Sequence, residues 1–113
     1  MSAMDKEKIF EKLRNYHEEK FPSKIENVEI SALRDEFQIL EEKTVSMILS
    51  LVYGRGQFTD SSTSLTAFTV KLGAINKETK NVDKSMNVFA TKIQLLGNIV
   101  EMAKNSSFNF KPA

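Results

Sequence analysis

The sequence contains no cysteine and no tryptophan, and only two prolines and four glycines occur among its 113 residues. Without cysteine, the chain can form no disulfide framework, no thiol catalyst and no cysteine-ligated zinc or iron–sulfur site. Its single histidine means that a two-histidine metal site would need a second chain. Because helix-breaking residues are scarce while Lys, Glu, Leu and Met are common, the composition predicts an all-α protein.

The chain also lacks a large excess of charge and a long apolar run. Its net charge is +1, so no overall field draws it to nucleic acid or to an anionic membrane. We find no apolar run of about 18 residues that would cross a bilayer, and no apolar segment behind the charged N-terminus that would make a signal peptide. With 41% hydrophobic and 27% charged residues, we expect one globular domain in the cytoplasm, without membrane contact.

An apolar series with steps of three and four residues dominates the C-terminal half of the sequence. The mean step of about 3.5 residues is the period of a helical seam that faces a partner helix. Because the phase holds across the polar stretch 76–81, we expect one continuous helix over 64–104. The series, in which Thr79 is the only polar member, consists of Leu65, Phe68, Leu72, Ile75, Thr79, Val82, Met86, Phe89, Ile93, Leu96, Val100 and Ala103.

Two further helices precede this series. The first is expected over 3–20, because Pro22 prevents the chain before it from continuing as a helix. The second is expected over 24–53, where Ser23 begins an S-x-x-E capping box. Gly54 can take the left-handed conformation that ends such a helix.

The last two helices are expected to form an antiparallel hairpin around a loop at 54–63. Residues 22–53 carry a net charge of −3 and residues 54–104 a net charge of +3, which favours their pairing. Residues 1–104 would then form a single helical domain, followed by a flexible tail at 105–113.

Two regions are apolar on more than one face, which is typical of helices buried on more than one side. One is the end of the second helix; the other is the end of the third helix. In a simple hairpin these regions lie far apart, and the first helix covers only the open end. We therefore expect a homodimer, or a helical protein partner, that packs against Val45, Ile48, Leu49, Val52 and Tyr53.

Two threonines interrupt the apolar seams. Thr44 and Thr79 are each expected to bond to a carbonyl one turn back, or to fix the register of the seam. Gly97 lies beside the long series. Its missing side chain either lets another helix approach closely or is a tolerated weak point that costs about 1 kcal/mol relative to alanine.

Carboxylates on the second helix are the arrangement closest to a metal site. Glu26 and Glu29, with Glu41 and Glu42 further along, are of the type that binds magnesium in all-α nucleotide pyrophosphohydrolases. Such sites need about four inward carboxylates from two helices. The third helix offers no E-x-x-D pair, so we expect an acidic solvent face, with no metal and no other cofactor.

The remaining ionisable residues also suggest no chemistry. His17 lacks the glutamate three residues earlier that a di-iron E-x-x-H motif needs, because Arg14 stands there, so a solvated or capping role is expected. The lysines of the third helix share no face, Glu78 and Asp83 lie among them, and no series of aromatic residues alternates with them to stack bases, so we expect solvated flank charges and no nucleic-acid binding. These lysines are Lys71, Lys77, Lys80, Lys84 and Lys92.

The layout of a short helical chain with a central glycine-containing turn is similar to that of the WxG-motif secreted helical hairpins. The motif itself is missing, because Tyr53 stands in the aromatic place and Arg55 two residues later. No family is assigned on this basis.

The sequence therefore predicts a long antiparallel helical hairpin with a shorter N-terminal helix, a coiled-coil-like three-helix bundle that dimerises. We expect a non-enzymatic interaction module, such as a scaffold, adaptor or chaperone-like protein, that self-associates through apolar helix faces. Two alternatives stay open: a nucleic-acid-associated regulatory protein, and a carboxylate-metal hydrolase formed at a dimer interface.

Overall fold

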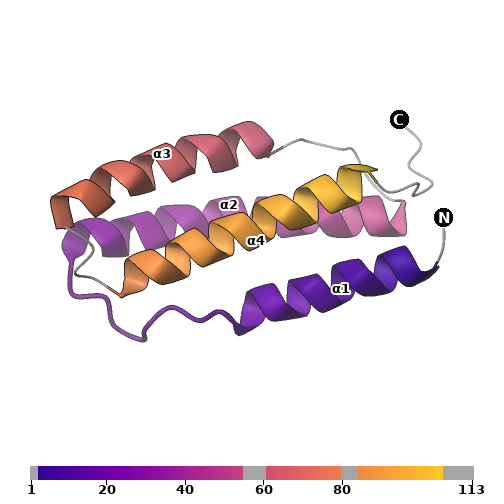
Figure 1. Ribbon diagram of the computed structural model, residues 1–113, viewed down its shortest axis with the longest axis horizontal. Helices are drawn as coiled ribbons and strands as arrows, with labels where there is room; N and C mark the ends of the chain where they lie inside the picture. The colour runs from indigo at the N-terminus through magenta and orange to yellow at the C-terminus, as the bar shows by residue number, and fades with distance from the viewer. Residues whose placement is uncertain (1–2, 55–60, 80–83, 106–113) are drawn as a thin grey trace.

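A computed structural model describes residues 3–54, 61–79 and 84–105 and shows four helices in this part of the chain (Figure 1). The predicted tail beyond residue 105 and most of the predicted hairpin loop lie outside the described residues. None of the described helices is long and apolar enough to cross a membrane. The helices are α1 (Ala3–Glu18), α2 (Val28–Tyr53), α3 (Ser62–Thr79) and α4 (Ser85–Asn105).

Successive helices run in opposite directions, so that α2 and α4 are parallel (Figure 1). This arrangement confirms the all-α prediction and the antiparallel pairing of α2 with the helix that follows it. The prediction of three helices was wrong, because the expected third helix consists of α3 and α4.

The break between α3 and α4 begins within the polar stretch 76–81, across which the apolar series keeps its phase. α3 ends at Thr79 and α4 begins at Ser85. The intervening sequence is Lys-Asn-Val-Asp-Lys, and its Asn81 and Asp83 are of the types that favour turns or caps over helix interiors. The phase of the series continues only because each helix has its own apolar face, so an unbroken 3.5-residue period did not indicate an unbroken helix.

The start of α2 also differs from the prediction. Asn27, rather than Ser23, is the N-cap, and its side-chain oxygen accepts a hydrogen bond from the Ile30 amide at 3.0 Å. Asparagine is as good an N-cap as serine, and its use leaves residues 19–27 as a non-helical linker between α1 and α2. The end of α2 is as predicted, because Gly54 has a φ of 63° and its amide donates to the Leu51 carbonyl at 3.2 Å.

The core is one hydrophobic cluster in which α4 packs against each of the other three helices. Four phenylalanine rings meet at its centre, one each from the linker, α2, α3 and α4. The ring centroids of Phe21 and Phe89 lie 4.6 Å apart, and those of Phe37 and Phe68 lie 5.2 Å apart. The four rings thus connect the linker, α2, α3 and α4. α1 contributes no ring to this group but also packs against α4.

The two regions with surplus apolar residues lie at the same end of the bundle. Because α2 and α4 are parallel, their C-terminal halves lie side by side (Figure 1). The N-terminal half of α1 reaches this end as well, where the rings of Phe10 and Tyr53 have centroids 6.0 Å apart. The expectation that the two regions lie far apart was therefore wrong, and its cause was the missed break between α3 and α4.

Thr44 is fully buried, and its hydroxyl donates to the hydroxyl of Ser61 at 3.0 Å. It therefore connects α2 to the residue that precedes α3, and the predicted bond to a carbonyl one turn back is not the one found. At Gly97 an added Cβ atom would meet no atom within 4 Å. Within one chain, Gly97 is thus a tolerated weak point rather than a position of close helix approach.

We predict that Gly97→Ala raises the free energy of unfolding by about 0.5–1 kcal/mol, because alanine restricts the unfolded chain and the folded helix has room for the methyl group. Chemical denaturation monitored by circular dichroism measures this. A loss of stability would contradict the prediction and would indicate that another helix approaches Gly97.

Candidate functional site

A buried lysine lies where α1, α2 and α4 meet. Lys92 of α4 is only 5% exposed. Its ammonium group donates hydrogen bonds to the carbonyl oxygens of Tyr16, at 3.2 Å, and Glu19, at 2.9 Å. Carbonyl groups at the end of a helix have no partner within that helix. Lys92 therefore caps the C-terminal end of α1 from a different helix, where a positive charge is also favoured by the helix dipole.

The same ammonium group interacts with a carboxylate and an aromatic ring. Lys92 Nζ lies 3.7 Å from Oε2 of Glu41 and 4.0 Å from the centroid of the Tyr16 ring. The Tyr16 hydroxyl donates to the same Glu41 oxygen. One residue from each of the three helices thus contributes to a single polar cluster, the Lys92–Glu41–Tyr16 cluster.

Burial changes the proton affinity of two of these groups. It lowers the pKa of Lys92, while the charge of Glu41 acts in the opposite direction and partly compensates. Burial also raises the pKa of Tyr16, and the hydrogen bond to Glu41 and the negative charge of Glu41 raise it further. Because the ammonium donates to two carbonyls and lies next to a carboxylate, we interpret this cluster as a structural connection rather than as a nucleophilic site.

The sequence analysis missed the burial of Lys92, which was expected to be a solvated flank charge. A signal was present, because Lys92 lies three residues after Phe89 and four before Leu96, on the face that carries buried apolar residues. Glu41 was expected on an acidic solvent face, but only 24% of its side chain is exposed. His17, in contrast, lies at the surface as expected, with its ring edge-on to Tyr16.

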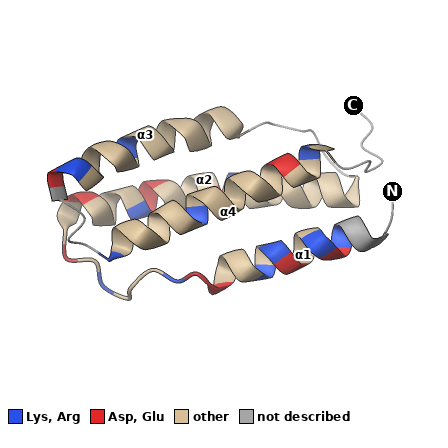
Figure 2. Ribbon diagram, in the orientation of Figure 1, with Lys and Arg blue, Asp and Glu red and all other residues tan. Residues whose placement is uncertain are grey.

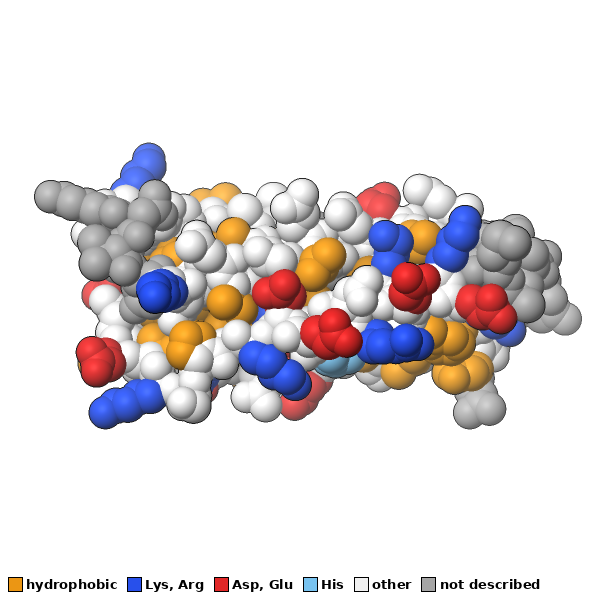
Figure 3. Space-filling model, turned by 60° about the horizontal axis from the view of Figure 1, so that its bottom comes forward, with side chains coloured by type: hydrophobic (Ala, Val, Ile, Leu, Met, Phe, Trp, Pro, Cys, Tyr) orange, Lys and Arg blue, Asp and Glu red, His pale blue; other side chains and the backbone are white. Residues whose placement is uncertain are grey.

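A cleft of about 240 Å³ opens beside this cluster. It lies between the end of α1, the linker, α2 and α4. Its lining includes Lys20 and Phe21 from the linker, Arg34 and Gln38 from α2, and Lys92 at its inner side. Charged side chains of both signs are interspersed over this side of the molecule, with hydrophobic side chains in small patches between them (Figure 3).

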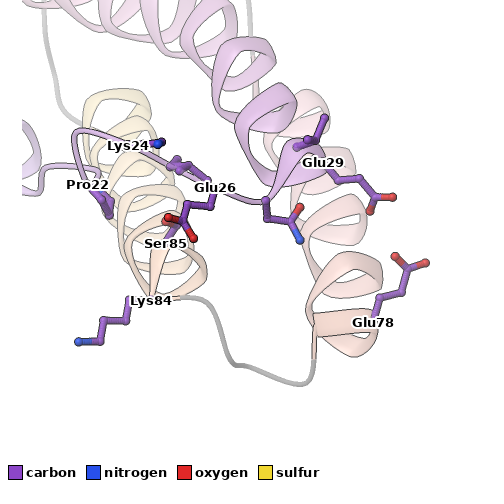
Figure 4. A pocket seen from close by; sticks show the side chains of 10 residues that line it. Pro22, Lys24, Glu26, Glu29, Glu78, Lys84 and Ser85 are labelled. Carbon is purple, nitrogen blue, oxygen red and sulfur yellow. The ribbon is translucent and has the colours of Figure 1, made fainter.

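The carboxylates considered as magnesium ligands do not converge. Glu26 and Glu29 line a hollow at the end of the bundle together with Glu78. Glu26 and Ser85 lie on one side of this hollow, whereas Glu29 of α2 and Glu78 of α3 lie on the other (Figure 4). Within the described residues, no three His, Asp or Glu side chains form a group that could hold a metal ion.

Four of the five predicted interface residues are covered within the chain. Ile48 and Val52 are buried, and Val45 and Leu49 are half-buried against the core. Tyr53 is exposed beside Phe10. A partner at this end of the bundle would therefore contact Tyr53 before it reached the other four.

A second, more apolar groove runs between α2 and α3. Its volume is about 330 Å³, and Ile39 on its wall is 59% exposed. An ion pair between Lys71 and Glu36, 2.6 Å apart, joins the two helices at its rim. α3 itself carries few charges, in contrast to the densely charged α1 (Figure 2). The groove is lined by Glu36, Ile39, Leu40, Lys43, Ala67 and Phe68, among others.

No protein-family model matches the chain, and no curated protein and no solved structure is significantly similar to it.

We predict that Glu41→Gln lowers the free energy of unfolding by about 2 kcal/mol, because it removes the negative charge that compensates the buried ammonium of Lys92. Glu42→Gln is the matched control, since Glu42 is exposed, and it should change stability by less than about 0.5 kcal/mol. Urea denaturation of the two variants measures the difference. Equal stabilities would show that Glu41 does not compensate Lys92.

We also predict that stability falls above about pH 10 because of Tyr16. In this range the unfolded chain loses the Tyr16 proton, whereas the folded chain retains it. The free energy of unfolding therefore falls by up to about 1.4 kcal/mol for each pH unit. Lys92 has the opposite effect on stability. Because its pKa is lowered in the folded protein, the unfolded chain binds more protons, and stability rises with pH until the unfolded lysine titrates at about pH 10.5. Denaturation between pH 10 and 11 should show a shallower decline for Tyr16→Phe than for the control Tyr53→Phe. Identical slopes would contradict this account.

Proposed function

We propose that this protein is a non-enzymatic helical interaction module that self-associates through the groove between α2 and α3. The exposure of Ile39 is the observation that carries the proposal. Most isoleucines of the described chain are buried or half-buried, but Ile39 is 59% exposed on the wall of an apolar groove. Covering such a side chain gains about 25 cal/mol for each Å² of apolar surface removed from water.

The charges around the groove favour a second copy as the partner. Glu36 and Lys43 both line the groove, three residues before and four residues after Ile39. In a two-fold contact, residue i of one copy meets residue j of the other, and the reverse also holds. If two α2 helices pack antiparallel about an axis near Ile39, Glu36 of each copy lies opposite Lys43 of the other. The α2 surface is thus complementary to itself.

The outer face of α3 extends this surface. Val70 is 69% exposed there, and the neighbouring exposed positions Ala67, Gly73 and Ala74 carry no charge. A stable interface buries about 800 Å² on each partner, more than a small groove supplies. The outer face of α3 therefore adds apolar area beside the groove, and its exposed lysines are Lys71 and Lys77.

The two other predicted functions have less support in the described part of the chain. A carboxylate-metal hydrolase would need Glu26 and Glu29 to converge with further carboxylates, but Glu41 is engaged by Tyr16 and Lys92. A nucleic-acid-associated regulator would need exposed lysines on one face, whereas Lys92 is buried. No specific observation favours either function over self-association.

We predict that the protein sediments as a dimer and that Ile39→Lys shifts it to a monomer, because a charge in the groove would have to be desolvated. Val28→Lys is the matched control, since Val28 is also on α2 and 80% exposed but lies outside the groove. It should leave the dimer intact. Analytical ultracentrifugation measures both. A wild-type monomer at high micromolar concentration would contradict the proposal.

Charge reversal tests the orientation of the dimer. Lys43→Glu would place two carboxylates opposite each other at both ends of the contact and should weaken dimerisation. Glu36 also pairs with Lys71 of its own chain, so Glu36→Lys is added together with Lys71→Glu, which keeps that pair with its charges exchanged. The combined variant restores opposite charges across the contact and should recover much of the affinity. Failure to recover would exclude the antiparallel arrangement, provided that the circular dichroism spectrum is that of the wild type.

A further inference from the structure

The cleft beside Lys92 is separate from the α2–α3 groove, and its lining suggests a ligand rather than a protein partner. Its volume is about 240 Å³. At ~30 Å³ for each water molecule in the liquid, this corresponds to about eight waters. The cleft therefore has the size of a small organic molecule, and α1, the linker, α2 and α4 form its walls.

Cationic side chains from three of these segments line the cleft: Lys20 from the linker, Arg34 from α2 and Lys92 from α4. Its carboxylates are Glu19 and Glu41, and Glu41 is already engaged within the Lys92–Glu41–Tyr16 cluster. The Lys92 ammonium is already engaged by two backbone carbonyls and by Glu41. Lys20 and Arg34 are therefore the cationic groups of the lining that face a ligand.

Arg34 and Phe21 give the cleft a polar and an apolar side. The ion pair of Arg34 within the described residues is with its neighbour Asp35, at 3.6 Å, and both side chains are solvated. Its planar guanidinium is suited to hold a carboxylate through two parallel hydrogen bonds. The half-buried ring of Phe21 packs against Phe89 and also lines the cleft. An apolar aromatic wall therefore lies next to the cationic groups.

We propose that this cleft binds a small aromatic carboxylate. The carboxylate group lies between Arg34 and Lys20, and the ring of the ligand packs against Phe21. Aromatic pairs of this kind gain stability beyond the burial of their surface when they are stacked with an offset or edge to face. The proposal is independent of self-association, because no residue of the α2–α3 groove takes part in it.

Titration with benzoate, followed by amide chemical shifts in the isotope-labelled protein, tests this proposal. We expect saturable shifts at residues 19–21, 34–38 and 92. Benzamide has the ring without the charge, and acetate has the charge without the ring, so each should bind at least about tenfold more weakly. Equal binding of benzoate and benzamide, or shifts that do not saturate, would overturn the proposal.

Variants of two arginines then locate the anion. Arg34→Gln should weaken benzoate binding at least about tenfold, which corresponds to 1.4 kcal/mol. Arg14→Gln removes an exposed arginine of α1 that lies outside the cleft, and should leave binding unchanged. Equal effects of the two substitutions would overturn the assignment. If the amide spectrum of Arg34→Gln is not that of a folded protein, Lys20→Gln replaces it, and unchanged affinity in that variant would overturn the assignment in the same way.

Discussion

One broad face of α4 has to be removed from water, and the arrangement of the other helices follows from this requirement. Nine of its 21 residues are buried and five more are half-buried, so no single neighbour can cover them. α1, α2 and α3 each pack against it, and the reversal of the chain between α3 and α4 makes this possible. The buried residues of α4 are Ser85, Met86, Phe89, Lys92, Ile93, Leu96, Ile99, Val100 and Ala103.

Covering α4 with α1 removes Lys92 from water, and the end of α1 supplies the compensation. The terminal carbonyls of α1 need donors, and the Lys92 ammonium needs acceptors once it is buried. Each group thus satisfies the other. A well-packed apolar residue in place of such an ion cluster often gives equal or greater stability. We therefore interpret the cluster as fixing where α1 lies along α4, since its hydrogen bonds allow only one position.

Features that depend on local sequence could be predicted. The helical period of the apolar residues indicated the all-α fold, and a glycine able to adopt positive φ marked the end of α2 at Gly54. The start of α2 could not be decided from the local sequence, because serine and asparagine are equally good N-caps and both Ser23 and Asn27 precede the helix. The break after Thr79 could not be predicted from periodicity, because the number of residues between α3 and α4 happens to keep the phase of the apolar series.

The two sites depend on that break and were therefore missed. A lysine such as Lys92 can be assigned to the core only when it is known which helix lies over it. Ile39 is not among the buried residues of α2. The groove beside it is formed by the packing of α3 against α2. The predicted surface around Ile48 was inferred for an unbroken hairpin, where the ends of α2 and α4 would have been far apart.

The contacts of α1 have a consequence for the order of folding. α3 directly follows α2 and directly precedes α4, so its contacts with both close shorter segments of chain, whereas the α2–α4 contact between Phe37 and Phe89 joins residues 52 positions apart. The hydrogen bond between Lys92 and Tyr16 joins residues 76 positions apart. Closing so long a segment costs more chain entropy and generally occurs after local contacts have formed. We therefore expect α1 to dock last onto a preformed three-helix unit, and to exchange its amide hydrogens before the rest of the core.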